Sequence, residues 1–299
     1  MLKGSIVAIV TPFNEDGNIN YDELGNLIEY HIENKTDGIV VLGTTGEAST
    51  IPYDEQEKIV EYSIAKANKR IPIIVGAGTN YTSKSIELAK KYSNMGADYL
   101  LVITPYYNKC NESGLYKHFT MIADNSSCPI ILYNVPSRTG MSISINVLKE
   151  LAKHPNIYGI KEASGDLNYT KEVINLTSDN FIIYSGNDDI IVEMISMGAK
   201  GVISVLSNIA PTQVHNMCEY AMNGDLNKAY NIQNSLLEVA NSLFIEVNPI
   251  PVKEALNYLG FNVGGYHLPL DYMSENNKSI LINVLNKNKE VIFWWKFVL

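Results

Sequence analysis

Short runs of apolar, largely β-branched residues recur eight times in the first two thirds of the chain, each closed by turn residues. They begin about 28 residues apart on average, which is near the length of a strand–helix–strand unit. We predict strands at 5–10, 38–42, 71–75, 99–103, 130–133, 157–160, 181–184 and 201–204. Their continuous apolar character is typical of parallel strands that are covered on both faces.

Stretches with apolar residues at helical spacing fill the gaps between these runs. We predict helices at 21–34, 54–68, 83–94, 114–124, 145–153, 169–176, 190–197 and 211–222. This alternation predicts an α/β fold, a (β/α)8 TIM barrel whose catalytic residues lie at the carboxyl ends of the strands. A doubly wound open sheet is the alternative, and the absence of a G-x-G-x-x-G fingerprint weakens it.

The pattern changes near residue 224, which predicts two parts. Residues 1–224 form the expected barrel catalytic domain, and residues 225–299 form a C-terminal helical extension. Within the extension we predict helices at 225–243, 252–259 and 274–288. Both tryptophans of the chain lie in the stretch 293–299, which we expect to pack on the body of the protein or on a partner subunit.

Composition and charge argue against several classes of protein. The chain has 23 Lys and Arg against 32 Asp and Glu, so its net charge of −9 is unlike that of a protein that coats nucleic acid or an anionic membrane. Its three cysteines form no CxxC pair, its five histidines show no metal-ligand spacing, and no apolar run is long enough for a membrane span. We therefore expect a cytoplasmic protein with no cofactor, no metal, and no nucleic-acid or membrane partner.

Lys161 is the most informative residue among the strand ends. It follows the apolar strand predicted at 157–160, so its amine is expected to face the pocket and to be partly dehydrated. Dehydration disfavours an ammonium, and a neutral amine can attack a ketone to form a Schiff base that acts as an electron sink. The alternative is a structural ion pair, although Glu162 should face the other way because neighbours in a strand alternate.

Hydroxyl groups are expected beside Lys161. Tyr133 ends the neighbouring strand, and its hydroxyl could shuttle the several protons that Schiff-base formation moves. Thr44 could extend that relay, and the turn of Thr44, Thr45 and Gly46 suits a carboxylate because a glycine-bounded turn exposes N–H donors. The alternatives are purely structural: Tyr133 would be a buried tyrosine with a hydrogen-bonded hydroxyl, and the segment at Thr44 would be an ordinary turn.

Two other loops carry charged residues. Arg138 follows the stiffening Pro136, and an arginine held over a pocket can grip a carboxylate with two hydrogen bonds, the alternative being a surface ion pair. After the strand at 181–184, Asp188 and Asp189 have no basic residue nearby, which argues against a phosphorylated substrate. We expect one of these aspartates to cap the next helix.

Three stretches in order along the chain resemble the dihydrodipicolinate synthase family. They are Gly43-Thr44-Thr45-Gly46-Glu47, Tyr133-Asn134-Val135-Pro136-Ser137-Arg138-Thr139-Gly140 and Gly159-Ile160-Lys161-Glu162-Ala163-Ser164-Gly165. The resemblance runs from residue 4 to about residue 253 and implies a class I pyruvate-dependent aldolase on a (β/α)8 barrel. It implies that Lys161 forms a Schiff base with pyruvate, whose enamine attacks L-aspartate 4-semialdehyde. The product is 4-hydroxy-tetrahydrodipicolinate, in lysine and diaminopimelate biosynthesis.

The resemblance also implies roles for individual side chains. Tyr133, Thr44 and Tyr107 match a proton relay, in which Tyr107 reaches in from a neighbouring subunit of a homotetramer built as a dimer of dimers. Substrate contacts are implied too: Thr45 with the pyruvate carboxylate, Arg138 with the semialdehyde carboxylate, and Gly186 and Ile203 in the pocket wall.

Two other functions stay open at this point. Another pyruvate-dependent aldolase, such as N-acetylneuraminate lyase or a keto-deoxy-sugar-acid aldolase, would share the lysine and the tyrosine but usually lacks an arginine at the position of Arg138. A non-catalytic barrel paralogue would bind or regulate without turnover. The presence of Lys161, Tyr133, Thr44 and Tyr107 argues against it.

The chain departs from the family pattern in two places. The site through which lysine inhibits some members matches at Asn80 and Tyr106 but departs from the commonest pattern at four positions: Ala48, Tyr53, Gln56 and Lys84. Lys84 would repel the ammonium groups of free lysine, so we predict weak or absent feedback inhibition. Cys110 stands where the family commonly has proline, and we expect this to loosen the loop past Tyr107 without removing the relay.

Overall fold

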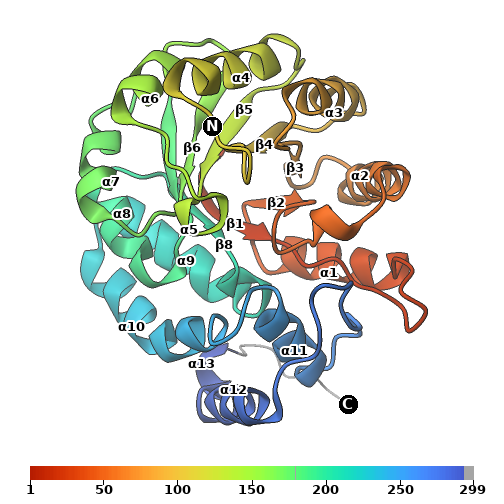
Figure 1. Ribbon diagram of the computed structural model, residues 1–299. Coiled ribbons are helices and arrows are strands. Elements are labelled where there is room, and N and C mark those ends of the chain that lie inside the picture. The colour runs from red at the N-terminus through yellow and green to blue at the C-terminus, as the bar shows by residue number, and fades with distance from the viewer. Residues whose placement is uncertain (179, 293–299) are drawn as a thin grey trace.

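The computed structural model, which describes residues 1–178 and 180–292, confirms the predicted barrel (Figure 1). Eight parallel strands close in chain order. They are β1 (Gly4–Ala8), β2 (Gly38–Val41), β3 (Ile73–Gly76), β4 (Tyr99–Ile103), β5 (Ile130–Asn134), β6 (Ile157–Glu162), β7 (Ile182–Ser185) and β8 (Gly201–Ser204). The aromatic stretch 293–299 lies outside the described residues, so its packing stays a prediction.

The strand bounds differ from the prediction by at most two residues, and two of the differences matter. β5 and β6 run on to Asn134 and Glu162, so Tyr133 and Lys161 lie inside their strands and are register partners. β3 begins at Ile73 rather than at 71 because Pro72 has no N–H to donate to a neighbouring strand.

Helices surround the barrel, and each of the eight predicted helices is present (Figure 1). They are α1 (Tyr21–Glu33), α2 (Tyr53–Ala67), α3 (Thr82–Asn94), α4 (Glu112–Asp124), α6 (Ile145–Leu151), α7 (Leu167–Ile174), α8 (Ile191–Met197) and α9 (Pro211–Met222). Single 3-10 turns lie at Ala48–Thr50, Asp188–Ile190 and Leu206–Asn208. Side-chain caps fix several helix starts; the Asn20 side chain, for example, accepts from the Glu23 N–H.

Of the short helices that were not predicted, one carries a candidate site residue. α5 (Pro136–Thr139) is a single turn that contains Arg138, in a stretch expected to be a loop. Pro136 occupies its first turn, and Gly140 ends it with a left-handed φ of 69°. Proline at the start and glycine at the end favour such a turn, so Arg138 is held more firmly than a loop would hold it.

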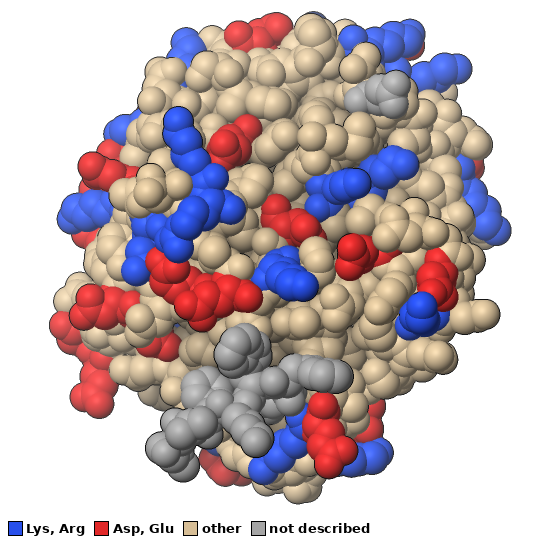
Figure 2. Space-filling model, turned by 180° about the vertical axis from the view of Figure 1, so that it is seen from behind, with Lys and Arg blue, Asp and Glu red and all other residues tan. Residues whose placement is uncertain are grey.

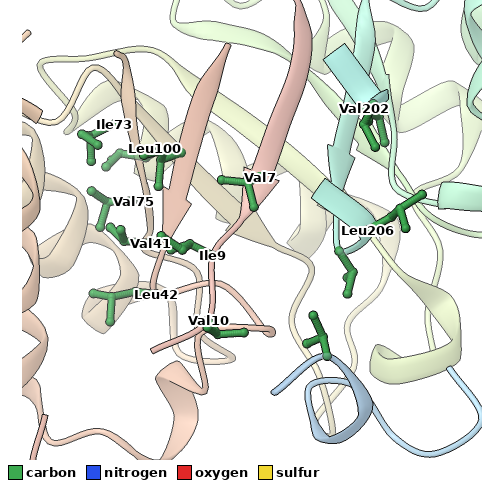
Figure 3. Packing of buried hydrophobic residues seen from close by; sticks show 14 of the residues in the cluster. Val7, Ile9, Val10, Val41, Leu42, Ile73, Val75, Leu100, Val202 and Leu206 are labelled. Atoms are coloured by element: carbon green, nitrogen blue, oxygen red, sulfur yellow. The ribbon is translucent and has the colours of Figure 1, made fainter. Parts of the chain in front are cut away.

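Apolar side chains fill the fold on both sides of the sheet. Val7, Val41 and Val75, on three neighbouring strands, belong to the layer between barrel and helices (Figure 3). Ile6 and Val40, each one residue before one of these valines, belong to the second set, inside the barrel. Burial of both faces explains the uninterrupted apolar runs of the sequence.

Four helices follow the barrel: α10 (Leu226–Ser242), α11 (Ile250–Tyr258), α12 (Glu275–Lys287) and α13 (Lys289–Ile292). α10 packs against α8 and α9, and α12 packs against α10 and α11. α11 also contacts the 3-10 turn at Leu206–Asn208, so it reaches the carboxyl end of β8. The C-terminal helices therefore border the end of the barrel where active sites lie.

The described part of the surface carries charges of both signs. On the face shown in Figure 2, basic and acidic side chains are interspersed. None of the described helices combines the length and the apolar character that a membrane crossing requires.

His31 makes the fold sensitive to acid. Burial lowers the pKa of His31 to about 3; its Nδ1 lies 3.0 Å from Thr36 Oγ1, and its Nε2 has no partner among the described residues. The unfolded chain binds a proton near pH 6.5, whereas the folded chain does not. Stability is therefore lost as the pH falls below 6.5, by about 3 kcal/mol at pH 4. Between pH 7 and pH 4, the free energy of unfolding of His31→Gln, measured by urea titration, should fall by about 3 kcal/mol less than that of the unmodified protein. Equal losses in the variant and the unmodified protein would contradict this assignment.

Candidate active site

Lys161 and Tyr133 meet at the carboxyl ends of β6 and β5. They are register partners, and Lys161 Nζ lies 4.4 Å from the centroid of the Tyr133 ring. Both residues are buried, at 6% and 7% exposure. In the part of the chain that the structure describes, no carboxylate lies within ion-pair distance of the Lys161 amine. The structural ion pair that competed with the catalytic interpretation is thus not seen.

Glu162 faces away from Lys161, as strand alternation predicts. Its carboxylate accepts hydrogen bonds from Asn134 Nδ2 at 2.8 Å and from the Ser164 N–H at 2.6 Å. Burial raises the pKa of Glu162, and these two donors oppose the shift. Glu162 therefore braces the loop after β6 on the opposite face of the strand.

Thr44 and Tyr133 line one cavity of about 320 Å³ at the carboxyl ends of β2 to β5. Gly76 is required beside it, because a Cβ there would collide with the carbonyl oxygen of Leu42. The cavity continues outward to Tyr53 and Tyr106. It therefore joins two members of the predicted relay to two positions of the predicted lysine-binding region.

The turn after β2 holds Thr45 against the C-terminal part of the chain. Asn248 Nδ2 donates to Thr45 Oγ1 at 3.0 Å, and Arg138 Nη2 donates to the Asn248 carbonyl oxygen at 3.1 Å. Asn248 thus joins the residues expected to hold the two substrate carboxylates. Sequence reasoning did not single it out, although it lies in the last stretch that resembles the family. Arg138 itself is exposed and has no carboxylate partner among the described residues.

Gly186 directly follows β7, and Ile203 lies in β8. Both are on the opposite side of β6 from Tyr133. The Gly186 N–H donates to the Glu162 carbonyl oxygen at 2.7 Å, and a Cβ on Gly186 would press on Ala163. Ile203 belongs to the apolar set inside the barrel, together with Tyr133. Neither residue is among those that line the cavity beside Thr44 and Tyr133, so their place in the pocket wall stays a prediction.

Tyr107 is the predicted site residue that a single chain does not bring into the cluster. It is 92% exposed, and its φ of 68° is left-handed. A bulky residue rarely takes that conformation without a reason in its surroundings. Its place in a relay completed by a neighbouring subunit stays a prediction.

The expectation that Asp188 or Asp189 caps the next helix is wrong. Neither the 3-10 turn at Asp188–Ile190 nor α8 has a side-chain cap. Asp188 is instead buried, and its Oδ2 accepts from the N–H groups of Val205 at 3.0 Å and Leu206 at 2.9 Å. Burial raises the pKa of Asp188, and the charge of Lys161 is among the opposing influences. Asp188 thus ties the loop after β7 to the segment after β8, a long-range contact that no local pattern indicates.

Within residues 1–178 and 180–292, no three His, Cys, Asp or Glu side chains are grouped as metal ligands. The site described above is built from an amine, hydroxyls, backbone N–H groups and a guanidinium.

Comparison with known proteins decides the family. The model of the Dihydrodipicolinate synthetase family matches residues 1–288. This chain belongs to that family. A 4-hydroxy-tetrahydrodipicolinate synthase from Clostridium perfringens (strain SM101 / Type A) is 51% identical over 288 residues, which cover 96% of this chain and 99% of that protein. The family predicted from the three motifs is confirmed.

Solved structures agree with this assignment. The chloride-inhibited dihydrodipicolinate synthase from Acinetobacter baumannii complexed with pyruvate is 44% identical, with a TM-score of 0.95 over 98% of this chain and 100% of that one. The enzyme from Cyanidioschyzon merolae with lysine bound is 34% identical, with a TM-score of 0.93 over 96% of this chain and 98% of that one.

Lys84 places an ammonium group, ion-paired with Glu87, in the predicted lysine-binding region of this family member. Lys84 Nζ lies 3.9 Å from the centroid of the Tyr53 ring and 2.7 Å from Glu87 Oε1. The Gln56 side chain is used within the fold, since its Nε2 donates to the carbonyl oxygens of Ala48 and Ile51, each at 2.9 Å. These contacts support the prediction of weak feedback.

We expect free lysine at submillimolar concentration to leave the initial rate of condensation nearly unchanged. Lys84→Glu reverses the charge beside Tyr53 and should lower the half-inhibiting lysine concentration roughly tenfold, an effect of a close surface charge pair. Lys90→Glu, on the same helix and exposed, is the matched control and should have no effect. Strong inhibition of the unmodified protein by submillimolar lysine would overturn the prediction.

Proposed function

We propose that this chain is a lyase of the class I aldolase type, a 4-hydroxy-tetrahydrodipicolinate synthase that condenses pyruvate with L-aspartate 4-semialdehyde. The observation that carries the site assignment is the buried Lys161 amine beside Tyr133, at the carboxyl end of the barrel, with no carboxylate partner among the described residues. An amine in that position is free to attack a ketone.

The reaction begins with attack of Lys161 Nζ on the carbonyl carbon of pyruvate. Water leaves, and an iminium joins the nitrogen to that carbon. Loss of a methyl proton gives an enamine, whose carbon attacks the aldehyde carbon of the semialdehyde and forms the new C–C bond. The amino group of the semialdehyde then attacks the iminium carbon, closes the ring and releases Lys161.

Protons move at several of these steps, and hydroxyl groups carry them. Tyr133 and Thr44 line the same cavity, which supports a shared relay between pyruvate and solvent. Tyr107 of a neighbouring subunit would complete that relay. Because Tyr107 is almost fully exposed on one chain, we propose a homo-oligomer, a tetramer built as a dimer of dimers.

Two carboxylates need separate binding groups. The turn at Thr44 and Thr45 offers N–H and hydroxyl donors to the carboxylate of pyruvate. Arg138, fixed by α5 and by Asn248, offers its guanidinium to the carboxylate of the semialdehyde. Gly186 and Ile203 would close the pocket around the apolar part of pyruvate. The cytoplasmic location expected from the sequence stays a prediction.

Pyruvate consumption tests the function directly, with L-aspartate 4-semialdehyde and N-acetylmannosamine compared as acceptors. Turnover only with the semialdehyde is the expected result. Turnover only with the sugar would assign the protein to the N-acetylneuraminate lyase branch. If neither acceptor reacts and borohydride traps no pyruvate on Lys161, the chain is a non-catalytic barrel.

A further inference from the structure

Lys253 on α11 is fully buried, far from the Schiff-base lysine in sequence, and has no role in the reaction described above. Its Nζ lies 2.9 Å from Glu47 Oε1, and the two side chains are 0% and 1% exposed. The same ammonium donates to the Thr11 carbonyl oxygen at 3.1 Å and lies 4.2 Å from the centroid of the Phe13 ring. Removing two charges from water costs free energy that their attraction often fails to offset, so stability alone is a poor explanation for this pair.

Glu47 is the last residue of the Gly43–Glu47 motif, whose turn carries the proposed pyruvate-binding threonines. Its backbone has a left-handed φ of 54°, which is strained for a residue with a Cβ. Its N–H donates to the Thr44 carbonyl oxygen at 3.1 Å, and this bond closes the turn. Its second carboxylate oxygen accepts from the His267 N–H at 3.2 Å. Two groups from the C-terminal part of the chain therefore hold the carboxylate of Glu47.

Every residue from Thr45 to Glu47 is tied to a partner outside the turn. Thr45 Oγ1 accepts from Asn248, the Gly46 carbonyl oxygen accepts from Thr11 Oγ1 at 2.7 Å, and Glu47 pairs with Lys253. Lys253 makes one of these ties directly, and it also donates to the backbone of Thr11, whose hydroxyl makes another. Removing Lys253 would therefore loosen the turn at two points.

We propose that Lys253 is a positioning residue that, through Glu47, holds the Thr44–Thr45 turn in the geometry that binds the pyruvate carboxylate. The inference rests on the proposed function, because it takes that turn as the pyruvate site. Glu47 neutralises the charge of Lys253, so the lysine acts through geometry and does not attract pyruvate directly. Donors in a turn bind an anion well only when they are aimed before it arrives.

The test compares pyruvate binding in variants that keep the rest of the pocket. Lys253→Met combined with Glu47→Gln removes both charges and leaves no buried charge unpaired. We expect the KM for pyruvate, and the pyruvate concentration for half-maximal borohydride trapping on Lys161, to rise roughly tenfold or more, because small misplacements of binding groups have effects of this size. At saturating pyruvate, any loss of kcat should be smaller than the rise in KM; Thr44 of the proposed relay lies in the same turn, so some loss is expected.

Lys278→Met is the matched control. Lys278 pairs with Glu254 at 2.9 Å in the same C-terminal region, and none of the contacts of the turn involves it. Its KM for pyruvate should equal that of the unmodified protein. A general loss of stability would lower the active fraction and therefore kcat, with KM unchanged, so the split between the two constants separates positioning from folding.

The outcomes separate failure of the positioning role from failure of the proposed function. A folded double variant with an unchanged KM for pyruvate would overturn the proposal and leave the pair a purely structural contact. If the double variant does not fold, Glu47→Asp keeps the charge on a shorter arm; a raised KM for pyruvate would support the proposal, and an unchanged one would overturn it. If borohydride traps no pyruvate on the unmodified protein, it is the proposed function that fails.

Discussion

Lys161→Arg is expected to lower kcat by at least about a thousandfold and to abolish borohydride trapping of pyruvate, since it removes the covalent route. Arginine keeps the positive charge beside the Tyr133 ring, but its guanidinium stays protonated and does not form a Schiff base with a ketone. The comparison therefore separates nucleophilic chemistry from simple charge. The measurements are initial rates at saturating substrates and the mass of the protein after reduction with pyruvate.

Lys153→Arg is the matched control for this substitution. Lys153 is exposed and pairs with Glu150 three residues away, so its replacement should leave both rate and adduct unchanged. If Lys161→Arg kept its activity within about tenfold of the unmodified protein, the Schiff-base assignment would be wrong. Trapping of pyruvate on a different lysine would move the reaction to that residue.

Arg138→Lys should raise the KM for the semialdehyde, with a loss of roughly a hundredfold in kcat/KM for that substrate. Lysine keeps the charge but lacks the planar pair of donors that matches a carboxylate. The α5 turn, with Pro136 and Gly140 at its ends, holds the backbone of this position whichever side chain it carries. Pyruvate trapping on Lys161 should therefore be unaffected.

Arg70→Lys provides the comparison for Arg138. Arg70 makes a bidentate pair with Glu29 on the surface, so loss of its fork should not alter either KM. One other result for Arg138→Lys would assign a different role to this arginine. If pyruvate trapping weakened as much as semialdehyde turnover, Arg138 would act mainly by holding Asn248, and through it Thr45, instead of binding the second substrate.

The proposed site could be predicted from sequence as far as it depends on strand order. Lys161 and Tyr133 lie near the carboxyl ends of consecutive strands of a parallel barrel, so their closeness follows from topology. Tyr107 shows the limit of this reasoning, because it is exposed on its own chain and strand order does not bring it to the cluster. Asp188 shows another limit, because its hydrogen bonds go to the segment after β8 and the sequence around it is equally typical of a helix cap.

The sequence by itself determined the eight strand–helix units, the class of fold and the family, because each of these depends on local sequence patterns. Apolar runs predict strands from residues that are neighbours in the sequence, and each of the three motifs is one continuous stretch of the chain. Only the tertiary structure decided that Asn248 binds Thr45 and that Lys253 pairs with Glu47. Each pair is separated by more than 200 residues. Packing of α11 at the carboxyl end of the barrel brings the two members of each pair together, and the hydrophobic periodicity of the chain does not predict that contact.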